Sequence, residues 1–298
     1  MGKSKKNAGP VDPAGLAELL RVGDGFRLAA VDPRSTPGFG GDKVAGQKAL
    51  DGGVDRLSAL QERLFAAARG GRSTRSVLLI VQGMDTSGKG GIVRHVVGAV
   101  DPQGVQHTAF KAPTPQELAH DFLWRIRPHV PNPGMLGVFD RSQYEDVLIA
   151  RVHQLVPEAT WRRRYDLING FEGSLAQNGT TIVKVMLQIS PDEQLARLSE
   201  RLTRPDKYWK YNPGDLDERQ RWADYQEAYQ DALTRCSTGA APWFVVPADR
   251  KWYARWAVQQ LLLDALIRID PQWPAATFDV EAERQRLATL AAALTPSP

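Results

Sequence analysis

Residues 82–91, QGMDTSGKGG, carry the first pattern in the sequence that could do chemistry. Gly83, Gly88 and Lys89 stand at the spacing of a phosphate-binding loop, G-x-x-x-x-G-K-S/T. Glycines let the backbone approach an anion closely, and a lysine supplies a compact cation for phosphoryl oxygens. The position where a hydroxyl would bind Mg²⁺ is Gly90, and Asp85 lies inside the loop instead. The pattern therefore predicts phosphate binding with an altered metal site.

A second carboxylate ends the apolar run MLGVFD at residues 135–140. P-loop enzymes hold Mg²⁺ with a carboxylate at the end of a buried strand, so Asp140 fits that role. Two carboxylates, with waters and phosphate oxygens, suit the octahedral preference of Mg²⁺. We therefore predict Asp85 and Asp140 as ligands of Mg²⁺, with Mn²⁺ as an alternative. Taken alone, Asp140 is equally typical of a helix N-cap, and Arg141 is expected either to contact phosphate or to form a surface salt bridge.

Residues 196–210, ARLSERLTRPDKYWK, concentrate positive charge. The basic side chains of this segment are Arg197, Arg201, Arg204, Lys207 and Lys210. The three arginines fall at i, i+4 and i+7, on one face of a helix. Like charges on one face repel each other unless an anion lies against them, which favours a cationic lid that closes over phosphates. A solvated helix face is the alternative.

Two other basic residues lie near the expected binding crevice. Arg94 is one turn into the helix that follows the loop, and Lys111 ends the second strand. Each is expected either to contact phosphate or to have a structural role. The run WRRRY at 161–165 either extends a basic track or is solvated.

The sequence offers no nucleophilic triad and no general base. Ser87 and Ser142 lack an evident His/Asp arrangement. An acceptor that is itself a phosphate oxygen is already anionic near neutral pH, so it needs positioning and charge neutralisation rather than deprotonation. This favours a kinase that acts on a nucleotide phosphate.

The elements that must position these residues alternate along the chain. Short apolar runs predict strands at 76–81, 105–110, 135–140, 180–189 and 242–247. Helices are predicted at 90–100, 114–127, 160–178, 190–204, 222–233 and 251–269. This alternation predicts an α/β fold with a five-stranded parallel sheet covered by helices on both faces. The ligand should bind at the carboxyl ends of the strands.

The pattern also suggests the limits of the domain. Residues 1–50 are rich in Gly, Pro and Asp, and we predict an irregular extension with one short helix near AGLAELLRV. A P-loop kinase domain is expected over 51–270, with its lid at about 197–215. Residues 271–298 are expected to form a tail with a short helix.

Composition restricts the class of protein. The chain has 298 residues, one cysteine, a net charge of +4 and a pI near 9.2. One cysteine excludes an internal disulfide framework. No apolar run reaches the roughly 18–20 residues that cross a bilayer. We expect a cytoplasmic protein without a membrane or nucleic-acid partner.

Taken together, these stretches resemble the polyphosphate kinase 2 family. The resemblance runs in collinear order over residues 25–270, through GMDTSGKGG, DPQGVQHTAFKAPT, ELAHDFLWR, VFDRSQYEDVLIARV, RLTRPDKYWKYNPGDLDER and APWFVVPADRKWY. The ELAHDFLWR and RSQYEDVL stretches, with DPRSTPGF, are similar to the class III branch, which accepts both AMP and ADP.

The resemblance implies a fold similar to thymidylate kinase, with a helical lid. It implies inorganic polyphosphate as donor and AMP or ADP as acceptor, with ATP as a product and guanine nucleotides as alternative acceptors. It also implies a homodimer or homotetramer. By the same resemblance Asp85 and Asp140 hold Mg²⁺ and Lys89 is the loop lysine. Arg141 matches the arginine of the family's DR pair, and Arg201, Lys207 and Lys210 match lid positions that bind phosphates. Arg204, which the charge pattern also predicts to bind phosphate, stands where some relatives carry another residue.

Two other functions remain open at this point. An ATP-dependent nucleoside monophosphate kinase would use the same fold, although Gly90 and the cationic segment argue against it. A non-catalytic polyanion-binding protein would explain the charge alone, but the modest pI gives it little support.

Overall fold

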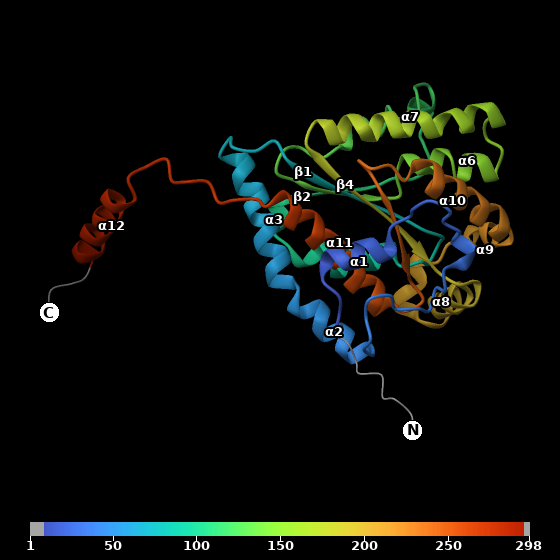
Figure 1. Ribbon diagram of the computed structural model, residues 1–298, viewed down its shortest axis with the longest axis horizontal. Coiled ribbons are helices and arrows are strands. Elements are labelled where there is room, and N and C mark those ends of the chain that lie inside the picture. The colour runs from blue at the N-terminus through green and yellow to red at the C-terminus, as the bar shows by residue number, and fades with distance from the viewer. Residues whose placement is uncertain (1–8, 295–298) are drawn as a thin grey trace.

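The computed structural model describes residues 9–294, which fold around a parallel sheet of five strands (Figure 1). The strand order is β2-β3-β1-β4-β5, and every neighbouring pair is parallel. The strands are β1 (Ser76–Gln82), β2 (Val105–Ala109), β3 (Leu136–Asp140), β4 (Thr180–Gln188) and β5 (Trp243–Pro247). All five strands agree with the predicted runs within two residues at either end. The predicted α/β class and five-stranded parallel sheet are confirmed.

Apolar side chains leave each central strand in alternate directions and build two cores. In β1, Val77, Leu79 and Val81 pack into one core, and Leu78 and Ile80 into the other. The first core is covered by α1 (Pro13–Leu20), α2 (Lys43–Gly52), α3 (Val54–Arg69), α4 (Lys89–His95) and α11 (Lys251–Ile269). The second is covered by α6 (Ile149–Val152), α7 (Glu158–Gln177) and α10 (Trp222–Cys236). Both faces of the central strands are buried, which explains why β1 and β3 are nearly continuous apolar runs. The edge strand β2 is only partly buried.

The register of the sheet sets where the site lies. Val81 of β1 is opposite Asp140 of β3, and Gln82 is opposite Met186 of β4. The loop predicted to bind phosphate starts directly after β1, so Asp140 is beside its first residue. Two carboxylates separated by more than fifty positions in the chain therefore line one cavity at this edge of the sheet.

The N-terminal segment differs from the predicted irregular extension. The short helix expected near AGLAELLRV is α1, but Leu16 and Leu20 of this helix belong to the first core. Phe39 packs edge-on against Trp252 and Trp256 of α11, at ring distances of 5.4 and 4.8 Å. Apolar side chains spaced among Gly and Pro residues dock this segment onto α11, so it is part of the domain rather than an appendage.

The helix predicted over 114–127 is also corrected. The capping box at Thr114 and Glu117 forms, but α5 (Pro115–Leu118) is a single turn. The carboxylate of Asp121 then accepts a hydrogen bond from the backbone N–H of Leu123, and the N–H of Trp124 donates to the Asp121 carbonyl. This local turn competes with helical hydrogen bonding and ends the helix early.

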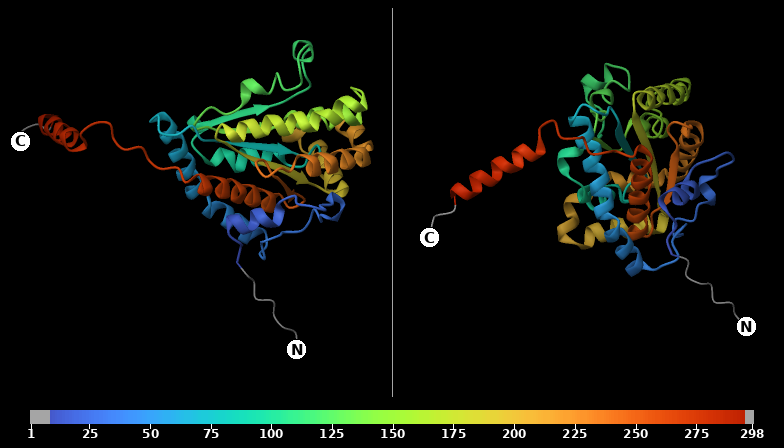
Figure 2. Two further views of the ribbon diagram at one scale, coloured as in Figure 1. Left: turned by 45° about the horizontal axis from the view of Figure 1, so that its top comes forward. Right: turned by 60° about the vertical axis from the view of Figure 1, so that its left-hand side comes forward.

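The remaining helices lie beside the site or leave the domain. Between β4 and α10 the chain forms α8 (Pro191–Thr203), the 3₁₀ segment η6 (Pro205–Lys210) and α9 (Gly214–Gln220). Helix α12 (Val280–Leu294) lies in the predicted tail and projects away from the domain in every view (Figure 2). Within residues 9–294, no helix is long and apolar enough to cross a membrane.

A buried ion pair stabilises the second core. Lys184 of β4 and Glu172 of α7 are both fully buried and pair at 2.5 Å. The Lys184 ammonium also donates to the Tyr144 hydroxyl at 2.8 Å and to the Cys236 carbonyl at 2.6 Å. Three acceptors thus satisfy the three donors of the lysine. Removing one partner of such a pair leaves the other charge buried without a partner, which destabilises the fold.

We therefore predict that Lys184→Met lowers the free energy of unfolding by about 3–5 kcal/mol, because Glu172 loses its partner in an apolar core. The exposed pair Glu158–Arg162 provides the control, and Arg162→Met should change stability by only about 0–1 kcal/mol. Urea unfolding monitored by circular dichroism measures both. Equal effects of the two variants would contradict a stabilising role for the buried pair.

Candidate active site

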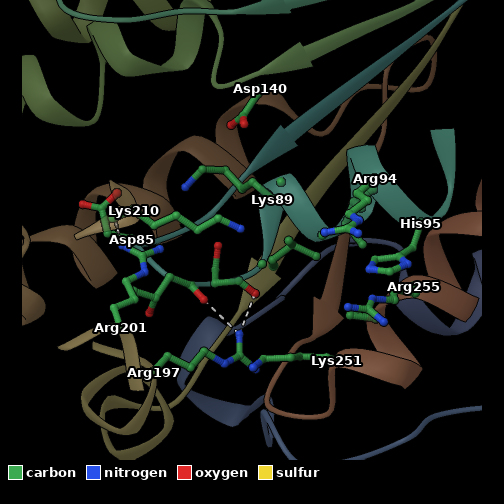
Figure 3. A pocket seen from close by; sticks show the side chains of 18 of the residues that line it. Asp85, Lys89, Arg94, His95, Asp140, Arg197, Arg201, Lys210, Lys251 and Arg255 are labelled. Carbon is green, nitrogen blue, oxygen red and sulfur yellow. Dashed lines mark hydrogen bonds between the residues drawn. The ribbon is translucent and has the colours of Figure 1, made fainter. Parts of the chain in front are cut away.

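A cavity of about 730 Å³ opens at the carboxyl ends of the central strands (Figure 3). Its wall is made by the loop after β1, the start of α4, Asp140 at the end of β3, the segment from α8 through η6, and the start of α11. Nine of the predicted site residues line it: Asp85, Gly88, Lys89, Gly90, Arg94, Asp140, Arg201, Lys207 and Lys210. Residues predicted from four separate segments thus share one cavity.

The loop after β1 holds unusual backbone conformations. Gly83 has φ 152° and Gly88 has φ 116°. A Cβ at Gly83 would lie 2.8 Å from the Leu187 carbonyl oxygen, so the backbone of β4 excludes any side chain there. Thr86, which is not glycine, is also left-handed at φ 65°. Holding a non-glycine residue there needs support from the surroundings.

Lys89 lies in the middle of the cavity and bends back over the loop. Its ammonium donates to the Gly83 carbonyl at 2.8 Å and more weakly to the Met84 carbonyl at 3.4 Å. The lysine therefore holds a cation directly above the loop, where the loop's backbone N–H groups favour an anion.

The two predicted metal-binding carboxylates are arranged differently. Asp140 has no hydrogen bond to a side chain among the described residues, whereas Asp85 accepts a hydrogen bond from Arg141 at 3.0 Å. Arg141 has φ 65° and does not line the cavity. Burial alone would lower the pKa of Arg141, but Glu145, Asp85 and Asp140 together raise it. Arg141 was expected either to contact phosphate or to form a surface salt bridge, and the structure shows a salt bridge. Its partner is Asp85, which lines the cavity.

Asp85 and Asp140 fit a magnesium ion that is also bound by substrate. No cluster of three or more His, Cys, Asp or Glu side chains within residues 9–294 is placed to hold a metal. Two carboxylates on one cavity leave the other octahedral positions to waters and phosphate oxygens, as Mg²⁺ prefers in phosphate-transfer sites. The donor set therefore suits Mg²⁺ better than a metal with a full protein cage.

The cationic segment is only partly directed at the cavity. Arg201 pairs with Asp215 of α9 at 3.0 Å, and Lys207 pairs with Glu200. Arg204 is half exposed, pairs with Glu200 and Asp206, and does not itself line the cavity. The expectation that this face needs an external anion is therefore wrong, because acidic neighbours already offset much of its charge.

Arg197 shows the clearest departure from the predicted lid face. Its side chain is 5% exposed, and its guanidinium donates to backbone carbonyls instead of facing solvent. The helical spacing placed Arg197, Arg201 and Arg204 on one face, but the docking of α8 buries the first and exposes the last. Three arginines on one helix face therefore lie in three environments: Arg197 is buried, Arg201 lines the cavity, and Arg204 is half exposed.

Two other predicted residues do not line the cavity. Lys111 has an exposed side chain, and its carbonyl accepts a hydrogen bond from Arg125 at 2.8 Å. Gly83 contributes the carbonyl that holds Lys89 rather than a cavity surface. The basic run at 161–165 lies on α7, where Arg162 pairs with Glu158 and Arg164 with Asp146. These arginines have local partners and are not part of the cavity wall.

Three basic residues of the cavity were not predicted: His95, Lys251 and Arg255. In Figure 3, Arg94, His95 and Arg255 lie together at one side of the view, and Asp85, Arg201 and Lys210 at the other. Burial, Arg255 and Arg94 lower the pKa of His95. Lys251 and Arg255 are one helical turn apart directly after β5, and this position at the end of a strand is the signal that could have identified them.

Comparison with known proteins places these features in a family. Residues 43–273 match the model of the family described as polyphosphate kinase 2. The chain is 46% identical to an AMP/ADP-polyphosphate phosphotransferase of Meiothermus ruber, over 84% of this chain and 91% of that protein. It is 41% identical to an ADP-polyphosphate phosphotransferase of Rhodopseudomonas palustris, over 87% and 92%. The crystal structure of polyphosphate kinase 2 from Arthrobacter aurescens superposes with a TM-score of 0.90 and 58% identity, over 95% and 100%.

The different environments of the two arginines on α8 give a direct test. We predict that Arg201→Ala lowers kcat/KM for phosphoryl transfer by about 100-fold, because it removes a cation from the cavity. Arg204→Ala should change it by less than about threefold, because an exposed ion pair contributes little. Steady-state kinetics on both variants measure this. A larger loss in Arg204→Ala would contradict the assignment.

Proposed function

The chain belongs to the polyphosphate kinase 2 family, and on this premise we propose that it transfers a phosphoryl group from inorganic polyphosphate to AMP and ADP. The observation that carries the proposal is one cavity in which a phosphate-binding loop and two carboxylates face cations from α4, η6 and α11. A donor with a negative charge on every phosphate requires many cations along its length. The relatives' names agree with this donor and these acceptors.

The loop and Lys89 would position the transferred group. Backbone N–H groups and the ammonium neutralise equatorial oxygens, on which charge is concentrated during transfer. Arg201 adds a cation from the opposite wall of the cavity. These groups are already in place before reaction, so little reorganisation is needed when charge develops.

Asp85 and Asp140 would hold Mg²⁺, which when bound supplies further charge neutralisation between donor and acceptor phosphates. Arg141 orients Asp85 through their 3.0 Å contact. The salt bridge thus keeps one metal-binding carboxylate in place while Asp140 is fixed by the end of β3.

The reaction needs neither a base nor a covalent enzyme intermediate. An anionic oxygen of the acceptor's terminal phosphate attacks the terminal phosphorus of polyphosphate, forming one P–O bond. The bridging P–O bond to the next phosphate breaks, and its electron pair stays on the shortened polyphosphate. No proton has to be removed from the acceptor, because a nucleotide phosphate is ionised at neutral pH. AMP would give ADP, and ADP would give ATP.

We also propose a homodimer or homotetramer, as the family resemblance implies. Light scattering of the purified chain determines its mass in solution. A monomer at assay concentrations would overturn this part of the proposal.

The donor and acceptors can be tested together. We expect long-chain polyphosphate with Mg²⁺ to convert AMP into ADP and ATP, and ADP into ATP, when nucleotides are separated by chromatography. GMP and GDP in parallel tubes test the base. ATP formed from ADP alone would restrict the acceptor to ADP. Turnover of AMP with ATP but not with polyphosphate would overturn the proposal in favour of an ATP-dependent kinase.

The metal site gives a second prediction. We expect Asp85→Asn and Asp140→Asn each to lower kcat by about 100-fold or more, because each loses a charged Mg²⁺ ligand. Asp166→Asn, on the exposed side of α7, is the matched control and should retain activity. Circular dichroism checks that the variants fold. Unchanged turnover in both site variants would contradict the metal assignment.

A further inference from the structure

We propose that Arg197 is a positioning residue that fixes the phosphate-binding loop in its active conformation and joins it to the lid helix. The inference rests on the proposed function. It gives Arg197 a role in the rate of transfer, although the residue is only 5% exposed and its guanidinium, at the wall of the cavity, donates to protein carbonyls and to Glu193. Three elements meet at its guanidinium: the loop after β1, helix α8, and the turn between β5 and α11.

The contacts of Arg197 use each of its nitrogens. Nε donates to Glu193 Oε1 at 2.7 Å within α8. One terminal nitrogen donates to the carbonyls of Thr86 and Ser87, both at 2.9 Å. The other donates to the carbonyls of Ala248 and Asp249 at 2.6 and 3.0 Å. A planar guanidinium presents donors in this fixed fork, which the single ammonium of lysine cannot reproduce.

These hydrogen bonds act on the strained part of the loop. Thr86 is left-handed at φ 65°, and Gly88 is at φ 116°. A trans peptide directs its N–H opposite to its carbonyl. When the Ser87 carbonyl is held by Arg197, the N–H of Gly88 is directed away from it. Arg197 therefore stabilises the conformation in which the loop can offer this N–H to phosphate.

The same contacts decide which part of the lid can move. Arg197 ties the first two turns of α8 to the loop and to the start of α11, so this part of the helix is a fixed support. Arg201 follows one turn later and lines the cavity. Any closing movement has to take place after residue 197, in the segment that includes η6. The clamp thus also sets the starting position of Arg201.

The test compares two arginines that each follow a glutamate by four residues on a helix. Arg197→Lys should lower kcat by about 10- to 100-fold, because the loop loses its exact orientation. KM for polyphosphate and for ADP should stay within about threefold, because the nitrogens of Arg197 are engaged by Glu193 and by backbone carbonyls rather than free for substrate. Arg162→Lys, whose partner is the exposed Glu158, should leave both constants unchanged. Added guanidinium should restore part of the kcat of Arg197→Ala.

Hydrogen–deuterium exchange provides a readout that does not depend on activity. Arg197→Lys should speed exchange in peptides covering residues 83–92, but not in β4 or α7. Glu193→Gln should show the same effect more weakly and serves if the Arg197 variants fail to fold. The proposal would be overturned if Arg197→Lys changed neither kcat nor the exchange rate of residues 83–92. It would also be overturned if the variant lost protection from exchange throughout the chain while each folded molecule kept its normal kcat. A wild-type chain without polyphosphate-dependent turnover would overturn the function, while exchange would still decide the role of Arg197.

Discussion

The site depends on a loop that must keep a backbone conformation most residues disfavour. Between Gly83 and Lys89 the chain turns from a buried strand into a short helix, with three left-handed residues on the way. Glycine tolerates two of these positions, and Thr86 occupies the third against its preference. The loop lies on the Leu187 carbonyl of β4, and Arg197 and Lys89 bind its carbonyls from opposite sides. The packed sheet therefore fixes the geometry that phosphate needs.

The distribution of charge follows from the same arrangement. If only cations surrounded the cavity, these side chains would repel one another whenever no anion was bound. Here several cations have acidic partners, as in the pairs Arg201–Asp215 and Lys207–Glu200. The pairing limits repulsion without removing the positive field that attracts a polyanion. Burial and Arg197 lower the pKa of Lys251, whereas its partner Glu200 at 3.6 Å opposes this shift.

The fold was predictable from local patterns because the central strands are buried on both faces. A strand that is apolar on every residue differs clearly from the amphipathic helices around it. One failure occurred where distant contacts override the local pattern, and the other where a local turn ends a helix early. The Gly- and Pro-rich segment before residue 50 looks irregular, yet Phe39 packs between two tryptophans of α11. The helix after Thr114 has a strong start signal, yet a turn at Asp121 ends it.

The sequence by itself determined the loop after β1, the parallel sheet and the sharing of one cavity by Asp85, Lys89 and Asp140. These depend on spacing within one loop and on the rule that the carboxyl ends of parallel strands share an edge. Only the tertiary structure decided which basic residues face the cavity. Periodicity gives the face of a helix but not its rotation against the domain, which is set by packing with residues far away in the chain. For that reason Arg197 is buried at the wall of the cavity, Arg204 is half exposed and does not line it, and Lys251 and Arg255 of α11 line it as well.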